Sequence, residues 1–301
     1  MSAVVLVTGA AGLVGQAVAF TLRKRGAAVL GLDLADDSQR GVVACDLRDA
    51  PRLTAITQSL EFAAIVHCGG VSGPAVHRED PGHVARTNIE STVNLLELAV
   101  ARGVPRFVFA SSAAVYGPTP EDVAVEEERP LRPTSVYAAS KVAGEALVEA
   151  CSHQYGLSGV SLRIAAVYGP GRRTPCAIRD MILAGQEGRP ATLPHGRDRR
   201  YHYIHVHDVA EAVVAAIRAD AVRKPAYTIA ADRGITMGEL AQLVRTIVPG
   251  PPVFVGETKD PLSDPQGPYN LDAAAADLNW RARIALPEGI RSYANALLQE
   301  T

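Results

Sequence analysis

Cysteine is scarce in this sequence, aromatic residues are few, and neither sign of charge dominates. The 301 residues include four scattered cysteines with no Cys-x-x-Cys pair: Cys45, Cys68, Cys151 and Cys176. This spacing argues against a disulfide framework and against a thiolate metal site, and it fits a reducing cytoplasm. The net charge is only -2, so we expect no binding to nucleic acid or to an anionic membrane surface.

A targeting or membrane-spanning segment is not expected either. The apolar stretch MSAVVLVTGAAGLVG has no basic n-region and runs directly into glycines. It is typical of a first β-strand rather than of a signal peptide. With 48% hydrophobic and 21% charged residues, the chain has the composition of a globular protein with one large or two modest domains.

Short β-rich runs alternate with helical patterns through the first half of the chain. Strands are predicted at residues 3–9, 28–33, 41–47, 63–70, 106–112 and 159–169. Helices are predicted at residues 14–26, 51–60, 85–103 and 135–155. Strands without polar alternation are buried on both faces. The alternation therefore predicts an α/β fold of the Rossmann type, with a doubly wound parallel sheet.

A glycine-rich segment, TGAAGLVG, joins the first strand to the first helix and contains Gly9, Gly12 and Gly15. Gly9 permits a tight turn, Gly12 lets the backbone approach a pyrophosphate, and Gly15 lets the helix pack closely on the sheet. The N-terminus of that helix favours phosphate groups. Asp33 ends the second strand, where its carboxylate can accept hydrogen bonds from a ribose and would repel a 2′-phosphate. The pattern predicts NAD rather than NADP, with turn capping as the alternative role of Asp33.

The pattern changes to loops and prolines after residue 169. We expect residues 1–169 to form an NAD-binding domain, to which residues 201–228 return. Residues 170–200 and 229–301 then form a smaller C-terminal substrate domain. Trp280, the only tryptophan, is expected to pack in this smaller domain.

A tyrosine and a lysine in the segment YAASK are candidates for proton transfer. Tyr137 and Lys141 are four residues apart on a predicted helix, so they share a face. A free tyrosine has a pKa of about 10, and a nearby cation favours the phenolate. Ser111 and Ser112 follow the fifth strand, at the carboxyl edge of the sheet where ligands bind. Each feature alone is typical of a solvated helix or a turn, but together they indicate an enzyme that transfers hydride.

These motifs carry a resemblance that covers almost the whole chain. TGAAGLVG, CDLRD, HCGG, TNIESTVNLLELA, FASSAAVYG, YAASK, LRIAAVYGPG and YIHVHDVAEA resemble the extended short-chain dehydrogenases/reductases of the NAD-dependent epimerase/dehydratase family. The resemblance implies a set of cofactor-binding residues: Gly9, Ala11, Gly12, Leu13, Val14, Gly15, Asp33, Asp46, Leu47, Cys68, Gly69, Gly70, Asn88, Ala110, Ser111, Tyr137 and Lys141. A turn-forming role is the alternative for Asp46.

The same resemblance implies catalytic roles. Tyr137 is the general base or acid, Lys141 contacts the nicotinamide ribose and tunes the pKa of the tyrosine, and Ser112 supplies the second hydroxyl. Ser111 is the alternative to Ser112. A homodimer is implied through the helices at residues 88–102 and 137–154.

Two departures from the nucleotide-sugar enzymes of this family affect the expected substrate. Ala166 stands where those enzymes commonly have an asparagine that contacts the substrate. Tyr201 and His202 stand where they commonly have Arg-Asp, with the arginine near the substrate diphosphate. Arg199 and Arg200 are the nearest replacements.

A third feature points to a sugar acid. The segment HCGGVSG resembles uronate dehydrogenases, which implies that Ser72 contacts the substrate. Arg172 and Arg173 are candidates to bind an acid group, with a loop-forming serine and solvated arginines as the alternative. We therefore expect an NAD-dependent oxidoreductase that oxidises a hydroxyl carbon of a sugar or sugar acid. The alternative is a nucleotide-sugar epimerase or dehydratase that keeps and recycles NAD.

Four histidines lie near the expected site or strands. His67, at a strand end beside the cofactor, is expected to be structural rather than catalytic. His202, His205 and His207 recur at short spacing, but alternate residues of a strand face opposite sides. We expect no metal site from them.

Overall fold

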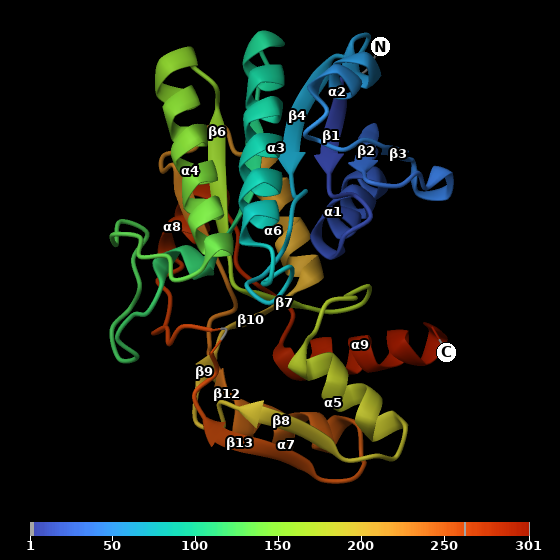
Figure 1. The fold of residues 1–301 in the computed structure, drawn as a ribbon, viewed down its shortest axis with the longest axis vertical. Coiled ribbons are helices and arrows are strands. Elements are labelled where there is room, and N and C mark those ends of the chain that lie inside the picture. The colour runs from blue at the N-terminus through green and yellow to red at the C-terminus, as the bar shows by residue number, and fades with distance from the viewer. Residues whose placement is uncertain (1–2, 262, 301) are drawn as a thin grey trace.

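A seven-stranded sheet forms the centre of the larger part of the molecule (Figure 1), in a computed structural model that describes residues 3–261 and 263–300. Its strands lie in the order β11-β6-β5-β4-β1-β2-β3, and every neighbouring pair is parallel. They are β1 (Val4–Thr8), β2 (Val29–Asp33), β3 (Val42–Ala44), β4 (Phe62–His67), β5 (Phe107–Ser112), β6 (Gly159–Ile164) and β11 (Ala226–Ile229). The predicted Rossmann-type α/β fold is confirmed.

Helices cover both faces of this sheet (Figure 1). On one face lie α3 (Pro81–Ala101) and α4 (Val136–Tyr155), and on the other lie α1 (Leu13–Lys24) and α6 (Val206–Arg218). The helix α2 (Ala50–Thr57) follows β3. Successive side chains of β1 point to opposite faces: Leu6 packs in the core with Leu95 of α3, and Val7 packs in the core with Val209 of α6.

Several boundaries differ from the predicted ones for local reasons. The helix predicted from residue 85 begins at Pro81, because the Asp80 side chain accepts a hydrogen bond from the His83 N–H and proline suits a first helical turn. The strand predicted at 41–47 is confined to Val42–Ala44. The strand predicted at 159–169 is two strands, because the chain leaves the sheet after Ile164. β7 (Ala166–Tyr168) then pairs with β10 (Tyr203–His205).

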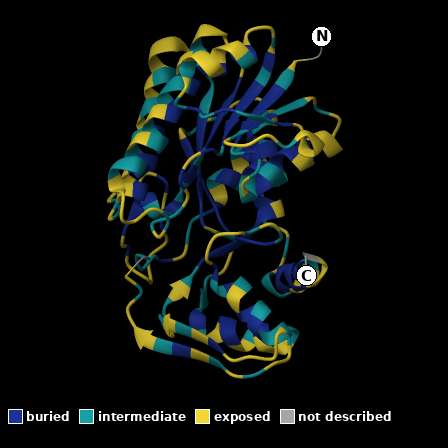
Figure 2. Ribbon diagram, turned by 45° about the vertical axis from the view of Figure 1, so that its right-hand side comes forward, coloured by how far each residue is buried: buried dark blue, intermediate teal, exposed yellow. Residues whose placement is uncertain are grey.

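A smaller part of the chain has its own core, visible as buried ribbon in the lower half of Figure 2. It contains α5 (Ala177–Gln186), β8 (Ala191–His195), β9 (Arg200–Tyr201), β12 (Ile235–Thr236), α7 (Met237–Ile247), β13 (Val253–Thr258) and α9 (Leu286–Glu300). β8 pairs with β13 and β9 with β12. Two short 3-10 helices, η1 (Ser38–Arg40) and η2 (Ala113–Tyr116), belong to the larger part.

The position of Trp280 corrects one expectation. Trp280 packs in the core of the central sheet rather than in the smaller part, together with Leu271 and Leu278. Its indole N–H donates to the backbone carbonyl of Asp208 at the start of α6 (3.1 Å). The helix α8 (Asp272–Leu278) therefore brings a C-terminal segment back to the sheet. Among the described helices, none is both long enough and apolar enough to cross a membrane.

Candidate active site

The glycine-rich turn after β1 is shaped by close backbone contacts. Gly9 has a φ of +65°, and a Cβ there would lie 2.7 Å from the Cys68 carbonyl oxygen. A Cβ at Gly15 would lie 2.1 Å from the Gly9 carbonyl oxygen. A side chain is therefore excluded at both positions. Gly12, the N-cap of α1, is exposed and offers no side chain, so the N-terminus of α1 stays open to an anionic group.

Asp33 ties the second strand to this turn. Its Oδ2 accepts from the Ala11 N–H (2.9 Å), and its Oδ1 accepts from the Leu34 N–H (2.8 Å). A carboxylate has further lone pairs beyond these two. A glycine cradle beside a carboxylate at the end of β2 fits a dinucleotide with a free ribose 2′-hydroxyl. The residues present therefore fit NAD.

Loss of the Asp33 carboxylate should weaken NAD binding. In Asp33→Ala the Ala11 and Leu34 N–H groups lose their acceptor. The ribose of NAD would also lose the carboxylate that accepts its hydrogen bonds. We expect the Kd for NAD to rise roughly 10- to 100-fold, measured by calorimetry after removal of bound cofactor. Glu61→Ala, which also removes an exposed acid, should leave the Kd unchanged. An equal Kd in Asp33→Ala and the control would contradict this role.

Two other predicted cofactor residues, Asp46 and Asn88, direct their polar groups to protein partners. Asp46 forms an ion pair with Arg48 (2.6 Å) that lowers the pKa of its carboxyl. The Asn88 side chain accepts a hydrogen bond from the Val71 N–H and donates to the Val71 carbonyl oxygen. It also donates to the Ser140 hydroxyl (2.8 Å). In this arrangement Asn88 ties the loop after β4 to α4.

The remaining predicted cofactor residues line the ends of β1, β3, β4 and β5. Leu47 is buried, and its Cδ1 would lie 2.8 Å from a Cβ at Gly69. Gly70 has a φ of +131°, and a Cβ there would lie 2.6 Å from the Asn88 Oδ1. Burial raises the pKa of the Cys68 thiol to about 12, so this thiol is not a nucleophile at neutral pH.

Tyr137 lies in the first turn of α4 and is 9% exposed. Burial raises the pKa of its phenol above the ordinary value. Hydrogen bonds from the Ser112 and Ser72 hydroxyls, the charge of Arg172 and the backbone of Gly73 act in the opposite direction. The structure thus brings Ser112, Arg172 and Ser72 to Tyr137, although they lie 25 to 65 residues from it in the sequence.

Lys141 is buried one turn further along α4. Its Nζ donates to the Ala110 carbonyl oxygen (2.8 Å) and lies 4.9 Å from the centre of the Phe109 ring. Burial lowers the pKa of this ammonium to about 8, although the neighbouring Cys68 and Glu145 raise it. The lysine is therefore held at the end of β5, beside the edge of the sheet at which Tyr137 lies.

The two adjacent serines have different surroundings. Ser112 is half-buried, and its Oγ accepts from the Ala114 N–H (3.2 Å) as the N-cap of η2. Ser111 is buried and donates to Glu145 Oε1 (2.5 Å). Glu145 is in turn paired with Arg163 at 2.7 Å, both side chains being 8% exposed. Ser111 therefore belongs to a buried ionic network, and Ser112 is the serine that faces Tyr137.

The predicted substrate residues lie in the loops around Tyr137 and in β7. Ser72 and Ala166 are exposed. The Arg172 guanidinium is fixed by carbonyl oxygens, including those of Val167 and Pro175. Arg173 is exposed, and no hydrogen bond of its side chain is found among the described residues. Arg172 therefore joins the site, whereas Arg173 points to solvent.

Tyr201 and His202, which stand before β10 in place of the family's Arg-Asp pair, contact other residues of the protein. The Tyr201 hydroxyl donates to Asp260 Oδ2 (3.0 Å), and the Arg199 guanidinium lies 5.6 Å from the Tyr201 ring centre. His202 is buried against the Tyr269 ring at 4.6 Å. Arg200 donates to the Gly234 carbonyl oxygen (3.2 Å).

His67 has the surroundings of a structural histidine. One ring nitrogen is 2.8 Å from the Thr8 hydroxyl and the other is 3.1 Å from the Thr92 hydroxyl. Burial lowers the pKa of the imidazole to about 3. Both nitrogens are satisfied, so this ring stays neutral and holds β4 to β1 and α3.

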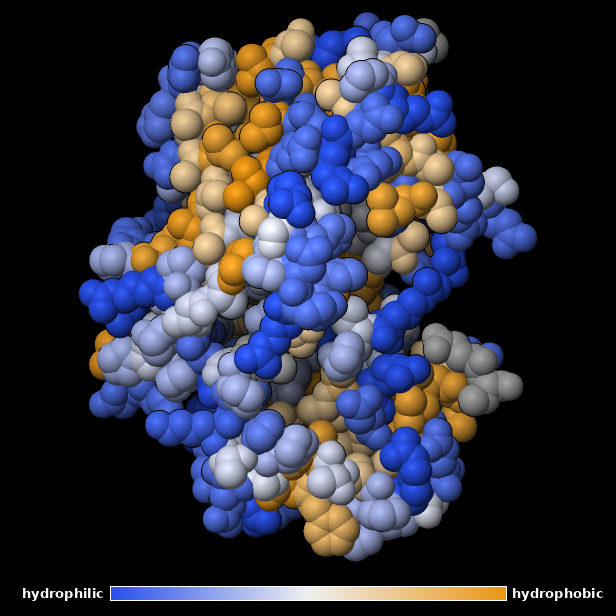
Figure 3. Space-filling view, in the orientation of Figure 1, coloured by the Kyte–Doolittle hydropathy of each residue, from blue (hydrophilic) through white to orange (hydrophobic). Residues whose placement is uncertain are grey.

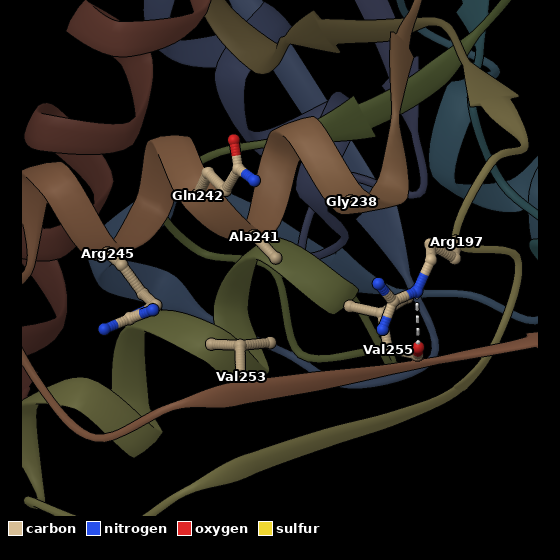
Figure 4. Close-up of a pocket in the computed structure, with 7 residues that line it drawn as sticks. All are labelled: Arg197, Gly238, Ala241, Gln242, Arg245, Val253 and Val255. Atoms are coloured by element: carbon tan, nitrogen blue, oxygen red, sulfur yellow. Dashed lines mark hydrogen bonds between the residues drawn. The ribbon is translucent and has the colours of Figure 1, made fainter.

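Two other features lie outside this site. Among the described residues, the acidic group close enough to hold a cation is Glu126, Glu127 and Glu128, and Lys224 pairs with two of these carboxylates. A pocket between α7 and β13 (Figure 4) contains none of the predicted site residues. It is lined by Arg197, Gly238, Ala241, Gln242, Arg245, Val253 and Val255.

Comparison with known proteins agrees with this geometry. A family model described as "NAD dependent epimerase/dehydratase family" matches residues 5–230. The chain belongs to this family. The predicted resemblance is therefore confirmed, and so is NAD as the cofactor.

Three proteins to which the chain is similar are relevant to its activity. UDP-glucuronate 4-epimerase 6 of Arabidopsis thaliana is 40% identical over 233 residues, which cover 71% of this chain and 51% of that protein. The structure of Thermus thermophilus UDP-glucose 4-epimerase with NAD is 29% identical, with a TM-score of 0.89 and coverage of 99% and 100%. MoeE5 with UDP-glucuronic acid and NAD is 25% identical, with a TM-score of 0.88 and full coverage of both chains. The chain spans about half the length of the Arabidopsis relatives it matches.

These relatives overturn the expected dehydrogenase. The prediction of net oxidation of a sugar or sugar acid, and of a dehydrogenase rather than an epimerase, is wrong, because the Arabidopsis relatives and the Thermus thermophilus protein are 4-epimerases. That prediction gave the short segment around Ser72 too much weight. A few loop residues carry less information than similarity along most of the chain.

Proposed function

We propose that the chain is a nucleotide-sugar 4-epimerase that keeps its NAD and recycles it. The observation that carries the proposal is the convergence of Ser112, Ser72 and Arg172 on the Tyr137 phenol, in a chain whose relatives are 4-epimerases. NAD, when bound, supplies a reversible hydride acceptor. The residues of this chain then hold the sugar and move one proton.

Each side chain has a defined part in this reaction. Tyr137 takes the proton from the sugar hydroxyl and later returns it, so no net acid or base is consumed. Ser112 donates a hydrogen bond to the same sugar oxygen and steadies it while its charge changes. Lys141 holds the end of β5 and contacts the nicotinamide ribose. Return of the hydride to the same carbon from the opposite face of the sugar would invert that one centre without net oxidation.

A hexuronic acid is the sugar we propose for this site. The Arg172 guanidinium acts on Tyr137 through its charge and is positioned by a carbonyl group of β7 and one of its own loop. A guanidinium can bind a carboxylate in a two-pronged hydrogen bond. UDP-glucuronate is therefore the first substrate to test.

The test of this function is a chromatographic assay of the purified protein without added NAD. With UDP-glucuronate we expect a mixture of the two C4 epimers and no net rise in NADH absorbance. UDP-glucose should be converted more slowly, since it lacks the carboxylate. Steady accumulation of NADH, or no epimer from either substrate, would reject the proposal.

We also propose that the protein is a homodimer and that it is cytoplasmic. Apolar side chains gather over α4 and beside α3 on the face shown in Figure 3, and Val136 and Tyr155 on α4 are exposed. A second copy of the chain would cover this surface. The four cysteines are free, which fits a reducing compartment.

A further inference from the structure

A segment near the C-terminal end of the chain lies along the loop that follows Ser112. The Pro265 and Pro268 carbonyl oxygens accept from the Thr119 and Val125 N–H groups, each at 2.8 Å. The Asn270 N–H donates to the Val125 carbonyl oxygen (3.0 Å). Residues 264–270 thus pair with residues 119–125 much as two strands do, although the two segments are about 145 residues apart in sequence.

Gln266 is the residue of this segment that reaches the active-site turn. Its Nε2 donates to the carbonyl oxygens of Ala113 (2.9 Å) and Gly117 (3.2 Å). Its Oε1 accepts a hydrogen bond from the Tyr269 hydroxyl. Both donors and one acceptor site of the amide are therefore used, and the Tyr269 contact fixes which end of the amide faces the turn.

One carbonyl group lies at the start of η2, the turn that Ser112 caps, and the other belongs to Gly117, which directly follows this turn. Ser112 Oγ accepts from the Ala114 N–H in the first part of this turn. Gly117, at its end, has a φ of +63°. Since a short 3-10 turn has weak hydrogen bonds of its own, contacts that hold both of its ends determine where the Ser112 hydroxyl lies relative to Tyr137.

We propose that Gln266 is a positioning residue that holds the Ala113–Tyr116 turn so that the Ser112 hydroxyl meets the Tyr137 phenol. Only the expected change in kcat rests on the proposed function. The contact itself is a property of the folded chain. Tyr269 takes part as the residue that orients the Gln266 amide, and its ring also packs against His202, between β9 and β10.

The test uses the NAD-loaded protein with 13C-labelled tyrosine, in which the Tyr137 signal is assigned by its loss in Tyr137→Phe. Gln266→Met keeps the volume of the side chain and removes both donors. The groups that face the phenol are Ser112, Ser72, Arg172 and the Gly73 backbone. Because the Ser112 hydrogen bond lowers the pKa of Tyr137, we expect the titration of Tyr137 to move to higher pH in Gln266→Met. With UDP-glucuronate, kcat should fall roughly 10- to 100-fold with little change in KM.

Asn270→Ala is the matched control. Asn270 lies in the same segment, but its side chain donates to the exposed Glu126 carboxylate (2.9 Å) rather than to the turn. The control should leave both the Tyr137 titration and kcat unchanged. Tyr269→Phe should shift the titration in the same direction as Gln266→Met but by less, and it serves as the second variant if the methionine variant does not fold.

The two proposals fail in different ways. An unchanged Tyr137 titration in folded Gln266→Met, or in Tyr269→Phe if that is the folded variant, would overturn the positioning role, whatever the substrate proves to be. A shifted titration in a protein that converts no nucleotide sugar would support the positioning role and reject the proposed function.

Discussion

Replacing Tyr137 with phenylalanine is expected to reduce epimerase turnover roughly 10³- to 10⁴-fold while NAD remains bound. The substitution removes only the hydroxyl that the Ser112 and Ser72 hydroxyls approach. The sugar hydroxyl then has no acceptor for its proton. Packing of the ring among Val71 and Val84 is kept, so the protein should remain folded.

Initial rates with UDP-glucuronate and the NAD content of the purified protein are the measurements. Tyr155→Phe is the matched control, because Tyr155 ends the same helix but is 58% exposed. The control should retain the wild-type rate. Turnover in Tyr137→Phe within tenfold of the wild-type rate would remove Tyr137 from the proposed chemistry.

Glu145→Gln is expected to destabilise the protein by about 3–5 kcal/mol, the largest stability effect that we expect. Glu145 and Arg163 form a two-pronged ion pair, and each side chain is only 8% exposed. The neutral amide leaves a buried guanidinium without its counter-charge. It also disturbs the Ser111 hydroxyl, which donates to Glu145.

Urea unfolding followed by circular dichroism measures this loss. Glu149→Gln is the control in the same helix, since Glu149 is 51% exposed and pairs with the exposed His153. It should change the free energy of unfolding by no more than about 0.5 kcal/mol. The double variant Glu145→Leu with Arg163→Met should recover much of the loss, because an apolar pair leaves no buried charge. Equal effects of the two glutamine variants would contradict a structural role for the buried pair.

The fold was predictable because its signals are local. Uninterrupted apolar runs and helical repeats gave the alternating pattern, and Gly9 and Gly15 mark a turn that excludes a side chain. Trp280 was misplaced because its segment looks like a loop-rich tail. Its partner, the Asp208 carbonyl, lies 72 residues earlier in the chain.

The position of some candidate site residues was also predictable, whereas their chemical roles stay predictions. Tyr137 and Lys141 are recognised by spacing on one helix, and Ser112 by its place after a strand. The separation of Ser112 from Ser111 was not visible, because it depends on Glu145 and on its buried partner Arg163. Nor could Gln266 be found, since its contacts with the turn span about 150 residues.

The kind of reaction was misjudged because a few local features, at Ser72, Ala166 and Tyr201–His202, outweighed the similarity along the rest of the chain. Ser72 does approach Tyr137, but a serine near a substrate hydroxyl is compatible with net oxidation and with epimerisation alike. The distinction lies in whether hydride returns to the sugar. Residues that touch the hydroxyl serve both outcomes, so their identities cannot separate them.

The fate of a deuterium label tests the central claim most directly. UDP-glucuronate carrying deuterium at C4 is incubated with the purified protein in ordinary water, and the product is analysed by NMR and mass spectrometry. We predict that the C4 epimer forms and keeps its deuterium at C4, because the atom removed from the sugar returns to the same carbon. Loss of the label from the product, or an oxidised sugar with NADH released into solution, would contradict an NAD-recycling epimerase.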